Sequence, residues 1–411
     1  MPLPHPKPLP SYWISPPSDL ANHRTTEDLP EEVDVLIIGS GYTGAATAYY
    51  LLQNPDGRPS TVILEARDAC SGATARNGGH VKPDLYMNTT VYEKMFGAKV
   101  ARELTDFEIQ QVLDVKRLVE TEDIDCDFEL TRAIDVFVDR RISGPTIQAY
   151  QSLRESGYEY PDDLHFISNP QKAEQVSGVK GALAAYSFTA GSIWPYKLVC
   201  HLLRRCLEWG ANLQTHTPVL SLSEGSDDNG YWTVTTERGS IRTKKVVLAT
   251  NAYTSTLLPD FHDKITPARG VATRIAVSDG GKRAPHLNNT YCIRYGPQEY
   301  DYLISRTDGS IVVGGAKQVV LTDESYWHNN INDSELIPGA DGYFNDYMQR
   351  TFYGWEDTDA KVTHIWTGAM GYSSDLMPWI GELPEKRGLY VAAGFTVRDV
   401  DVSACSHPFS F

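Results

Sequence analysis

One stretch of the chain, residues 33–65, constrains the fold most, because it surrounds a glycine-rich turn with the elements that such a turn requires. The apolar run Val-Leu-Ile-Ile leads into Gly-Ser-Gly-Tyr-Thr-Gly at residues 39–44, and a helix of small residues and a second apolar strand follow. The glycines allow a tight turn, close approach of the backbone to a pyrophosphate, and close packing of helix on strand. The N-terminus of the helix offers unpaired N–H groups to the phosphates. The sequence therefore predicts a Rossmann-type βαβ unit that binds a nucleotide.

Glu65 ends the second strand, where a carboxylate accepts hydrogen bonds from ribose hydroxyls. It follows Gly39 by 26 residues (65 − 39), and the turn-forming stretch 54–59 accounts for the excess over the usual spacing of about 20. An acid here argues against a 2′-phosphate and hence against NADP. A methyltransferase or an NAD-dependent dehydrogenase shares these features, so both stay open at this point. The nucleotide contacts expected from this unit are Gly39, Gly41, Tyr42, Thr43, Gly44, Glu65, Ala66 and Arg67.

A second motif follows directly after the acid, in the run Cys-Ser-Gly-Ala-Thr-Ala-Arg-Asn-Gly-Gly-His at residues 70–80. This run resembles the D-amino-acid-oxidase-type FAD-dependent oxidoreductases, which include sarcosine, glycine and γ-glutamylputrescine oxidases. In that family, a Gly-Ala-Ser/Thr-x-x-Asn-Gly-Gly run wraps the pyrophosphate and reaches the flavin ring. The resemblance implies FAD as the cofactor, and the contacts that it adds are Gly72, Ala73, Thr74, Asn77, Gly78, Gly79 and His80.

Further landmarks of the family follow in the same order along the chain. A valine that reads adenine through its backbone corresponds to Val219, and a strand with a small-residue turn beneath the pyrophosphate corresponds to residues 246–252. The segment after the strand at 389–393 matches as far as Thr396. The FAD contacts implied by these landmarks are Val219, Ala249, Thr250, Gly394, Phe395 and Thr396.

The fold class that the resemblance implies is α/β, with a Rossmann-type FAD-binding domain interleaved with a substrate domain built on an antiparallel sheet. Several short apolar runs between residues 271 and 315 also favour an antiparallel sheet. The expected divisions are a proline-rich extended arm at 1–30, an FAD-binding domain at 31–95, 186–268 and 360–396, a substrate domain at 96–185 and 269–359, and an atypical tail at 397–411.

The resemblance also implies a reaction, the oxidation of a C–N bond by hydride transfer to flavin N5, with a small amine or amino-acid-like molecule as substrate and secondary metabolism as one setting. In glycine and D-amino-acid oxidases, an arginine grips the substrate carboxylate where this chain has Met370. We therefore expect a preference for amines, with Arg294 or Lys317 as alternative carboxylate clamps. Sarcosine oxidases carry an oxygen-activating lysine near the position of Val312, so oxidase and dehydrogenase activities both stay open.

The side chains expected beside the flavin or the substrate are His80, Tyr295 and Tyr372. His80 fits a tuning, substrate-binding or covalent role toward the flavin, and equally an ordinary hydrogen-bonded loop histidine. The two tyrosines are expected in the pocket wall.

Beyond Thr396 the chain departs from the family, which continues with Gly-His-Gly and a long helix directed at the flavin. Residues 397–411 have neither those glycines nor helical periodicity, which favours a truncated member of the family. Three functions therefore stay open: an active FAD-dependent oxidoreductase, a non-catalytic flavin-binding remnant, and an NAD-dependent dehydrogenase.

Composition excludes other classes of function. A net charge of −16 would repel phosphate, so we expect no nucleic-acid partner. No apolar run is long enough for a membrane span, and the N-terminus does not read as a signal peptide. The six cysteines lack the spacing of metal ligands, so we expect reduced thiols, no metal and a cytoplasmic location. The sequence does not determine the oligomeric state.

Overall fold

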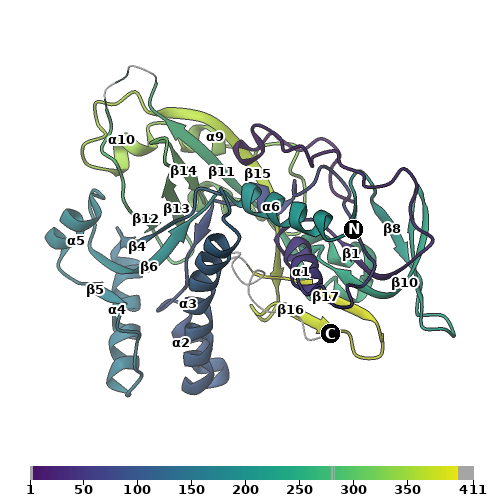
Figure 1. Cartoon of the computed structure of the whole chain (residues 1–411). Coiled ribbons are helices and arrows are strands. Elements are labelled where there is room, and N and C mark those ends of the chain that lie inside the picture. Colours follow the sequence, from purple (N-terminus) through teal and green to yellow (C-terminus); the bar gives the residue numbers. More distant parts are fainter. Residues whose placement is uncertain (1–2, 279–280, 282, 397–411) are drawn as a thin grey trace.

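Two β-sheets organise the chain in the computed structural model, which describes residues 3–278, 281 and 283–396 (Figure 1). The expected α/β fold class is confirmed, and the tail at 397–411 lies outside the described residues. The polypeptide crosses repeatedly between the sheets: β2 is followed by β3, β6 by β7, β10 by β11 and β15 by β16, and in each case the two strands belong to different sheets. The division into domain ranges stays a prediction.

The first sheet carries the predicted βαβ unit. Its order is β16-β17-β10-β1-β2-β7, with β9 paired to β10 and β8 paired to β9. The strands from β17 to β7 run parallel, and β2 is buried along its whole length, as expected for a sheet covered on both faces. The strands are β1 (Glu32–Ile38), β2 (Thr61–Leu64), β7 (Asn212–Gln214), β8 (Val219–Leu222), β9 (Trp232–Thr236), β10 (Gly239–Leu248), β16 (Trp379–Glu382) and β17 (Leu389–Ala393).

The second sheet is mostly antiparallel and has the order β15-β11-β14-β13-β12-β4-β6-β3, with β5 paired to β6. The pair β12–β4 is parallel, and β11 pairs with β15 over nearly its full length. The strands are β3 (His80–Val81), β4 (Glu129–Phe137), β5 (His165–Ile167), β6 (Ala184–Ser192), β11 (Ile265–Ala276), β12 (Thr290–Arg294), β13 (Tyr300–Ser305), β14 (Ile311–Gly314) and β15 (Lys361–Ser373).

Helices α1 and α6 pack together beside the first sheet, while α2, α3 and α4 project away from the second (Figure 1). Helices α2 and α3 are separated at Gly97, whose φ of +84° suits glycine. The helices are α1 (Tyr42–Leu52), α2 (Thr89–Phe96), α3 (Ala98–Thr121), α4 (Arg140–Glu155), α5 (Pro170–Ser177), α6 (Pro195–Glu208), α7 (Thr254–Leu257), α8 (Lys317–Val320), α9 (Ala340–Tyr343) and α10 (Tyr347–Thr351), with short 3₁₀ turns η1 (Tyr12–Ile14), η2 (Ala73–Arg76), η3 (Asn251–Tyr253), η4 (Pro259–Phe261) and η5 (Glu324–Tyr326).

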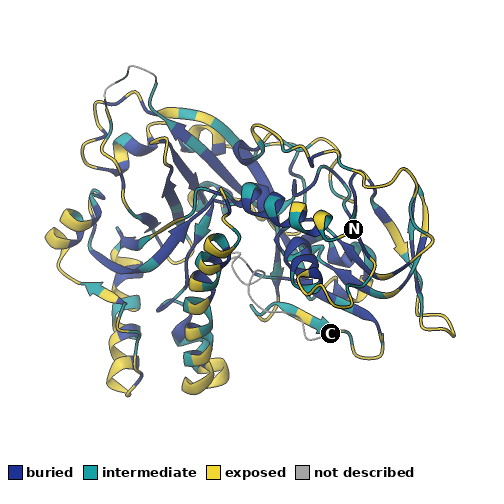
Figure 2. Cartoon of the chain, viewed as in Figure 1, coloured by how far each residue is buried: buried dark blue, intermediate teal, exposed yellow. Residues whose placement is uncertain are grey.

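Burial is concentrated where the two sheets meet their helices, and the outer faces of α2–α4 are exposed (Figure 2). The largest core joins β1, α1 and α6 to β14 and β15 and includes Trp13 from the N-terminal arm. The arm is thus more than an extended surface segment, because the Trp13 side chain is fully buried. The five cysteines in the described part of the chain are buried, and none of them forms a disulfide with another described residue.

Candidate functional site

The predicted nucleotide contacts surround one cavity at the carboxyl ends of β1 and β2, called here the nucleotide cavity. The space between its walls, part of which is open to solvent, is about 1100 Å³. The expected contacts that line it are Gly39, Gly41, Tyr42, Thr43, Glu65, Ala66, Arg67, Gly72, Ala73, Thr74, Val219, Ala249, Thr250 and Phe395. Three contacts expected near the flavin, Asn77, Gly78 and His80, line the adjoining cavity described below. Gly44, Gly79 and Gly394 line neither cavity, and Thr396 lines a third one beside α3.

The glycines at the turn hold three backbone segments closer together than any side chain allows. A Cβ at Gly39 would lie 2.6 Å from the carbonyl oxygen of Ala249, and the φ of this glycine is +107°. A Cβ at Gly44 would lie 1.8 Å from the carbonyl oxygen of Gly39. Gly44 therefore acts through the packing of α1 on β1, the role expected of the third glycine in this motif.

Glu65 is fixed at the rim of the nucleotide cavity by three donors. One carboxylate oxygen, Oε2, accepts from the backbone N–H of Ser40 at 3.1 Å and from its hydroxyl at 2.6 Å. The other, Oε1, accepts from the N–H of Arg67 at 3.1 Å. Each carboxylate oxygen has more than one acceptor direction, so the carboxylate retains capacity for a ligand hydroxyl.

The loop of residues 72–79 is held by its own polar side chains. Thr74 Oγ1 accepts from the N–H of Tyr42 at 3.0 Å, which ties the loop to the first turn of α1. Asn77 donates to the carbonyl of Thr74 at 2.9 Å and accepts from the N–H of Gly79 at 2.8 Å. A Cβ at Gly78 would lie 2.3 Å from the ring of Tyr302, so the loop lies directly against β13.

The N-terminal arm supports the same loop from behind. Ser11 Oγ donates to the carbonyl of Ala75 at 2.6 Å, and Trp13 Nε1 donates to the carbonyl of Asn77 at 2.6 Å. The carbonyl of Trp13 in turn accepts from Trp194 Nε1 at 2.7 Å. The conformation of the loop therefore depends on a segment far away in the sequence.

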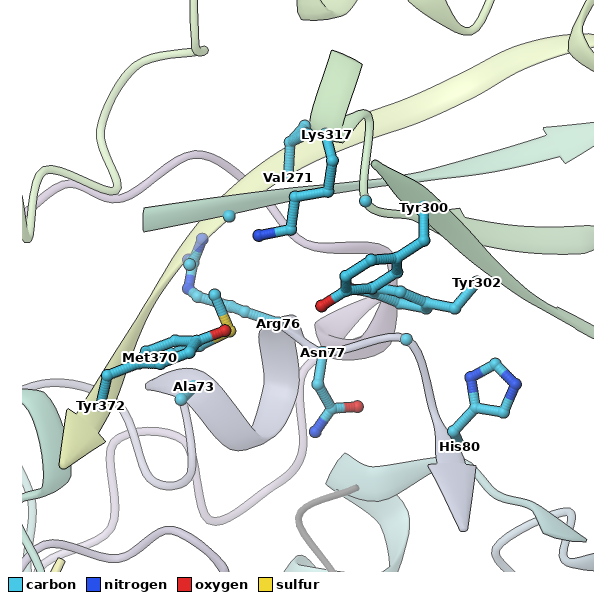
Figure 3. Close-up of a pocket in the computed structure, with 14 residues that line it drawn as sticks. Ala73, Arg76, Asn77, His80, Val271, Tyr300, Tyr302, Lys317, Met370 and Tyr372 are labelled. Carbon is cyan, nitrogen blue, oxygen red and sulfur yellow. The ribbon is translucent and has the colours of Figure 1, made fainter. Parts of the chain in front are cut away.

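A second cavity, called here the tyrosine cavity, continues from the nucleotide cavity, and Ala73 lines both. Its walls come from the 72–80 loop, β11, β13, β15 and the start of α8, and the space between them, part of which is open to solvent, is about 760 Å³. Figure 3 shows Met370 and Tyr372 on one side, Tyr300 and Tyr302 on the other, and Lys317 above them with its amine directed inward. This arrangement provides a largely apolar, aromatic chamber with one inward-facing amine among the labelled residues.

His80 lies at the end of the tyrosine cavity below Tyr302, and its ring meets the ring of Tyr302 edge-on at a centroid distance of 5.8 Å (Figure 3). Both ring nitrogens are buried and lack a hydrogen-bond partner within the described part of the chain. Burial, reinforced by the charge of Lys82, lowers the pKa of His80 to about 3. The imidazole is therefore neutral at physiological pH.

Two side chains proposed from sequence, Tyr295 and Arg294, lie elsewhere, and so does Val312, which stands near the position of the lysine of sarcosine oxidases. Tyr295 lines neither cavity; its hydroxyl lies 3.5 Å from that of Tyr347 in the core of the second sheet. Arg294 lines neither cavity and is buried 3.5 Å from Asp135, so it does not replace the missing arginine. Val312 is completely buried in the core. Tyr372 and Lys317 do line the tyrosine cavity, as expected.

Sequence reasoning missed Tyr300 and Tyr302, which form a wall of the tyrosine cavity. Their spacing of two residues within a strand puts both side chains on one face, and this alternation was a usable signal. It also missed Arg76, whose guanidinium donates to the carbonyls of Ser71, Thr367 and Leu9. Arg67, expected as a cofactor contact, lines the nucleotide cavity but directs its guanidinium to Asp333 at 2.9 Å.

Comparison with known proteins identifies the family. A sequence model of the family of FAD-dependent oxidoreductases matches residues 34–404. The chain belongs to this family. The match ends at residue 404, which is eight residues (404 − 396) beyond Thr396, the last residue that matches the motifs of the family. FAD is therefore the cofactor of the family, and the NAD-dependent alternative is set aside.

Individual relatives are distant. The probable oxidoreductase OrdL of Haemophilus influenzae is 23% identical over 57% of this chain. The matched part covers 52% of OrdL, so the chain spans about half the length of that relative. The γ-glutamylputrescine oxidoreductase of Escherichia coli is 23% identical over 91% of this chain and 81% of its own length. The crystal structure of glycine oxidase from Geobacillus kaustophilus superposes with a TM-score of 0.70 over 92% of each chain at 19% identity, which shows a shared fold.

The nucleotide cavity fits the cofactor of the family. The N-terminus of α1 at Gly41 and the carboxylate of Glu65 line it, and the aromatic chamber adjoins it at Ala73. No helix in the described ranges is long and apolar enough to cross a membrane. Within the same ranges, no group of three or more His, Cys, Asp or Glu residues could hold a metal ion.

Proposed function

We propose that this chain uses FAD to oxidise a C–N bond of a small amine or amino-acid-like substrate in the tyrosine cavity. The observation that carries the proposal is that the two cavities are adjacent, because Ala73 lines both and the residues of the 72–80 loop line first one and then the other. A cofactor bound along the first cavity presents its reactive end to the second. The names of the relatives, an oxidoreductase of γ-glutamylputrescine and an oxidase of glycine, support the substrate class.

The proposed contacts follow the nucleotide cavity from end to end. Glu65 accepts the ribose hydroxyls, Val219 meets the adenine, and the N-terminus of α1 at Gly41 faces the pyrophosphate. Asn77 and Gly78 then lie toward the flavin ring. When bound, FAD supplies a hydride acceptor for the carbon that bears the amine nitrogen.

The side chains of the tyrosine cavity orient the substrate and exclude water. Met370 and Tyr372 come from one strand, β15, and Tyr300 and Tyr302 from another, β13, so the chamber is built on rigid elements. Met370 offers no positive charge to a carboxylate on the reacting carbon. A carboxylate buried against this thioether would lose hydration without a partner, so we expect amines to be preferred to free α-amino acids.

The experiment is anaerobic mixing of the purified, FAD-loaded full chain with a panel of amines and α-amino acids, followed by flavin absorbance. Bleaching of the flavin bands by amines supports the proposal, and subsequent admission of oxygen distinguishes an oxidase from a dehydrogenase. Fast reduction by ordinary α-amino acids, with amines inert, would contradict the expected preference. A protein that retains FAD but is bleached by no member of the panel would instead support the non-catalytic flavin-binding alternative.

A further inference from the structure

Residues 3–6 of the N-terminal arm lie at the nucleotide cavity, far in sequence from the motifs that predicted the site. Leu3 and Pro4 line this cavity. Leu3, His5 and Pro6 line a neighbouring depression, called here the outer groove, whose other walls include residues of the 3₁₀ turns η4 and η5. Consecutive residues of the arm thus line first the cavity and then the groove. The segment 3–6 therefore stands between the two.

Two anchors hold this segment in place. The carbonyl of His5 accepts from Arg67 Nη1 at 3.1 Å, and Arg67 itself lines the nucleotide cavity. Four residues further on, the carbonyl of Leu9 accepts from Arg76 Nη2 at 2.8 Å, and its N–H donates to the carbonyl of Asp333 at 2.8 Å. Both arginines lie between β2 and β3, in the stretch that carries the family motif. The arm is therefore attached to the cofactor site itself.

The sequence of the arm makes it stiff. Prolines stand at positions 4, 6, 8 and 10, and each ring fixes its own φ and restricts the residue before it to extended conformations. A stiff segment loses little conformational entropy when it covers a ligand. Leu3 lies two residues from the anchor at His5, so this anchor limits where the Leu3 side chain can move.

We propose that residues 3–6 complete the cofactor site, with Leu3 and Pro4 packed against bound FAD, and that this segment slows the release of FAD. The inference concerns the cofactor of the family and does not depend on the substrate. Leu3 is 37% exposed on the wall of the cavity, so a bound molecule can remove further apolar surface from water there. FAD that leaves the cavity has to give up this contact.

The first test measures whether FAD covers the segment. Leu3→Cys places a thiol on the cavity wall, and Lys7→Cys places one on an exposed residue of the same arm that lines neither the cavity nor the groove. Modification of each thiol by a maleimide is followed by mass spectrometry of the N-terminal peptide. Saturating FAD should slow the modification of Leu3→Cys by about tenfold or more and leave that of Lys7→Cys within about twofold. An equal effect of FAD at both positions would overturn the proposal.

The second test measures release from the FAD-loaded full chain. Leu3→Ser removes the apolar contact, so FAD should dissociate about tenfold faster, as measured by the recovery of flavin fluorescence after dilution. The matched control is Val176→Ser on α5, which removes an apolar side chain that is 44% exposed and lines neither the nucleotide cavity nor the tyrosine cavity. Its release rate should equal that of the wild type.

Urea unfolding of the FAD-free proteins separates a contact with the cofactor from a structural role. Leu3→Ser and Val176→Ser should unfold at the same urea concentration as the wild type. An unchanged release rate in Leu3→Ser would overturn the proposal, and so would faster release accompanied by a loss of stability in the FAD-free protein. Neither test uses a substrate, so both results stand whether or not any amine reduces the flavin.

Discussion

The most informative perturbation is Asp333→Asn, because this carboxylate joins segments that the chain brings together from far apart. Arg67 Nη1 lies 2.9 Å from Oδ2 and 3.2 Å from Oδ1, and Arg76 Nε lies 3.5 Å from Oδ2. The side chain of Asp333 is 2% exposed. The backbone carbonyl of the same residue accepts from the N–H of Leu9 in the arm at 2.8 Å.

The cost follows from removing one negative charge between two buried positive charges. Loss of one partner from a buried ion pair costs about 3–5 kcal/mol, because the remaining charge stays desolvated and unpaired. Burial lowers the pKa of Arg76 to about 10, so this guanidinium remains charged at neutral pH and does not escape the penalty by losing its proton. Asparagine keeps one oxygen acceptor for Arg67, so we expect a loss near the lower end, about 3 kcal/mol.

The assay is urea unfolding at neutral pH, followed by tryptophan fluorescence, with the free energy of unfolding taken from the first transition. The matched control is Asp106→Asn, whose partner Arg102 lies 2.9 Å away on the exposed face of α3. That pair should contribute about 0–1 kcal/mol. If Asp333→Asn destabilises no more than Asp106→Asn, the buried cluster does not hold the arm and the loop together as argued.

Three further predictions concern the cofactor and pH. Glu65→Ala should raise the Kd for FAD at least about tenfold in a fluorescence titration, because ribose hydrogen bonds and the Ser40 contacts are lost together. An unchanged Kd for FAD would show that Glu65 does not bind the ribose. Gly41→Val should abolish FAD retention after gel filtration, because even a Cβ there lies 2.9 Å from Thr74 Oγ1 and the branches would fill the pyrophosphate space, whereas Gly225→Val, in open space, should retain it. Burial raises the pKa of Asp301 from 3.8 to about 6, so the carboxyl group loses its proton at a higher pH in the folded protein than in the unfolded chain. The stability advantage of the wild type over Asp301→Asn in urea titrations should therefore shrink as pH rises from about 4 to about 6, and a flat difference would contradict the raised pKa.

The nucleotide-binding half could be predicted because its chemistry is local in sequence. The turn at 39–44 and the loop at 72–80 are each contiguous in sequence, so both motifs can be recognised locally, although Gly39 and Gly78 are constrained by Ala249 and Tyr302 from elsewhere in the chain. Most of the FAD contacts expected from these motifs lie around one cavity. The cofactor and the family are confirmed by the family match, whereas the role of each contact residue stays a prediction.

The substrate pocket could be predicted only in part, because its residues come from β13, α8 and β15 and meet through the register of the second sheet. Tyr295 and Tyr300 illustrate the difficulty. They stand at opposite ends of one hairpin connection, where the N–H of Tyr295 donates to the carbonyl of Glu299 at 2.8 Å, yet one faces the core and the other the cavity. No local pattern distinguishes them without the position of the hairpin relative to the 72–80 loop.

A local motif predicts which residues form a site more readily than it predicts how those residues are arranged in space, and the N-terminal arm shows why. The loop of residues 72–79 carries the family signature, but its backbone carbonyls at Ala75 and Asn77 are bound by Ser11 and Trp13. Proline-rich composition predicted an extended arm and gave no reason to place Trp13, which is completely buried, beneath that loop. The arm supports the 72–79 loop through contacts that span more than sixty residues of sequence, as the separation of 64 between Trp13 and Asn77 shows. Such contacts are selected by packing of the whole fold, so a signature motif identifies the cofactor while distant segments hold the site in shape.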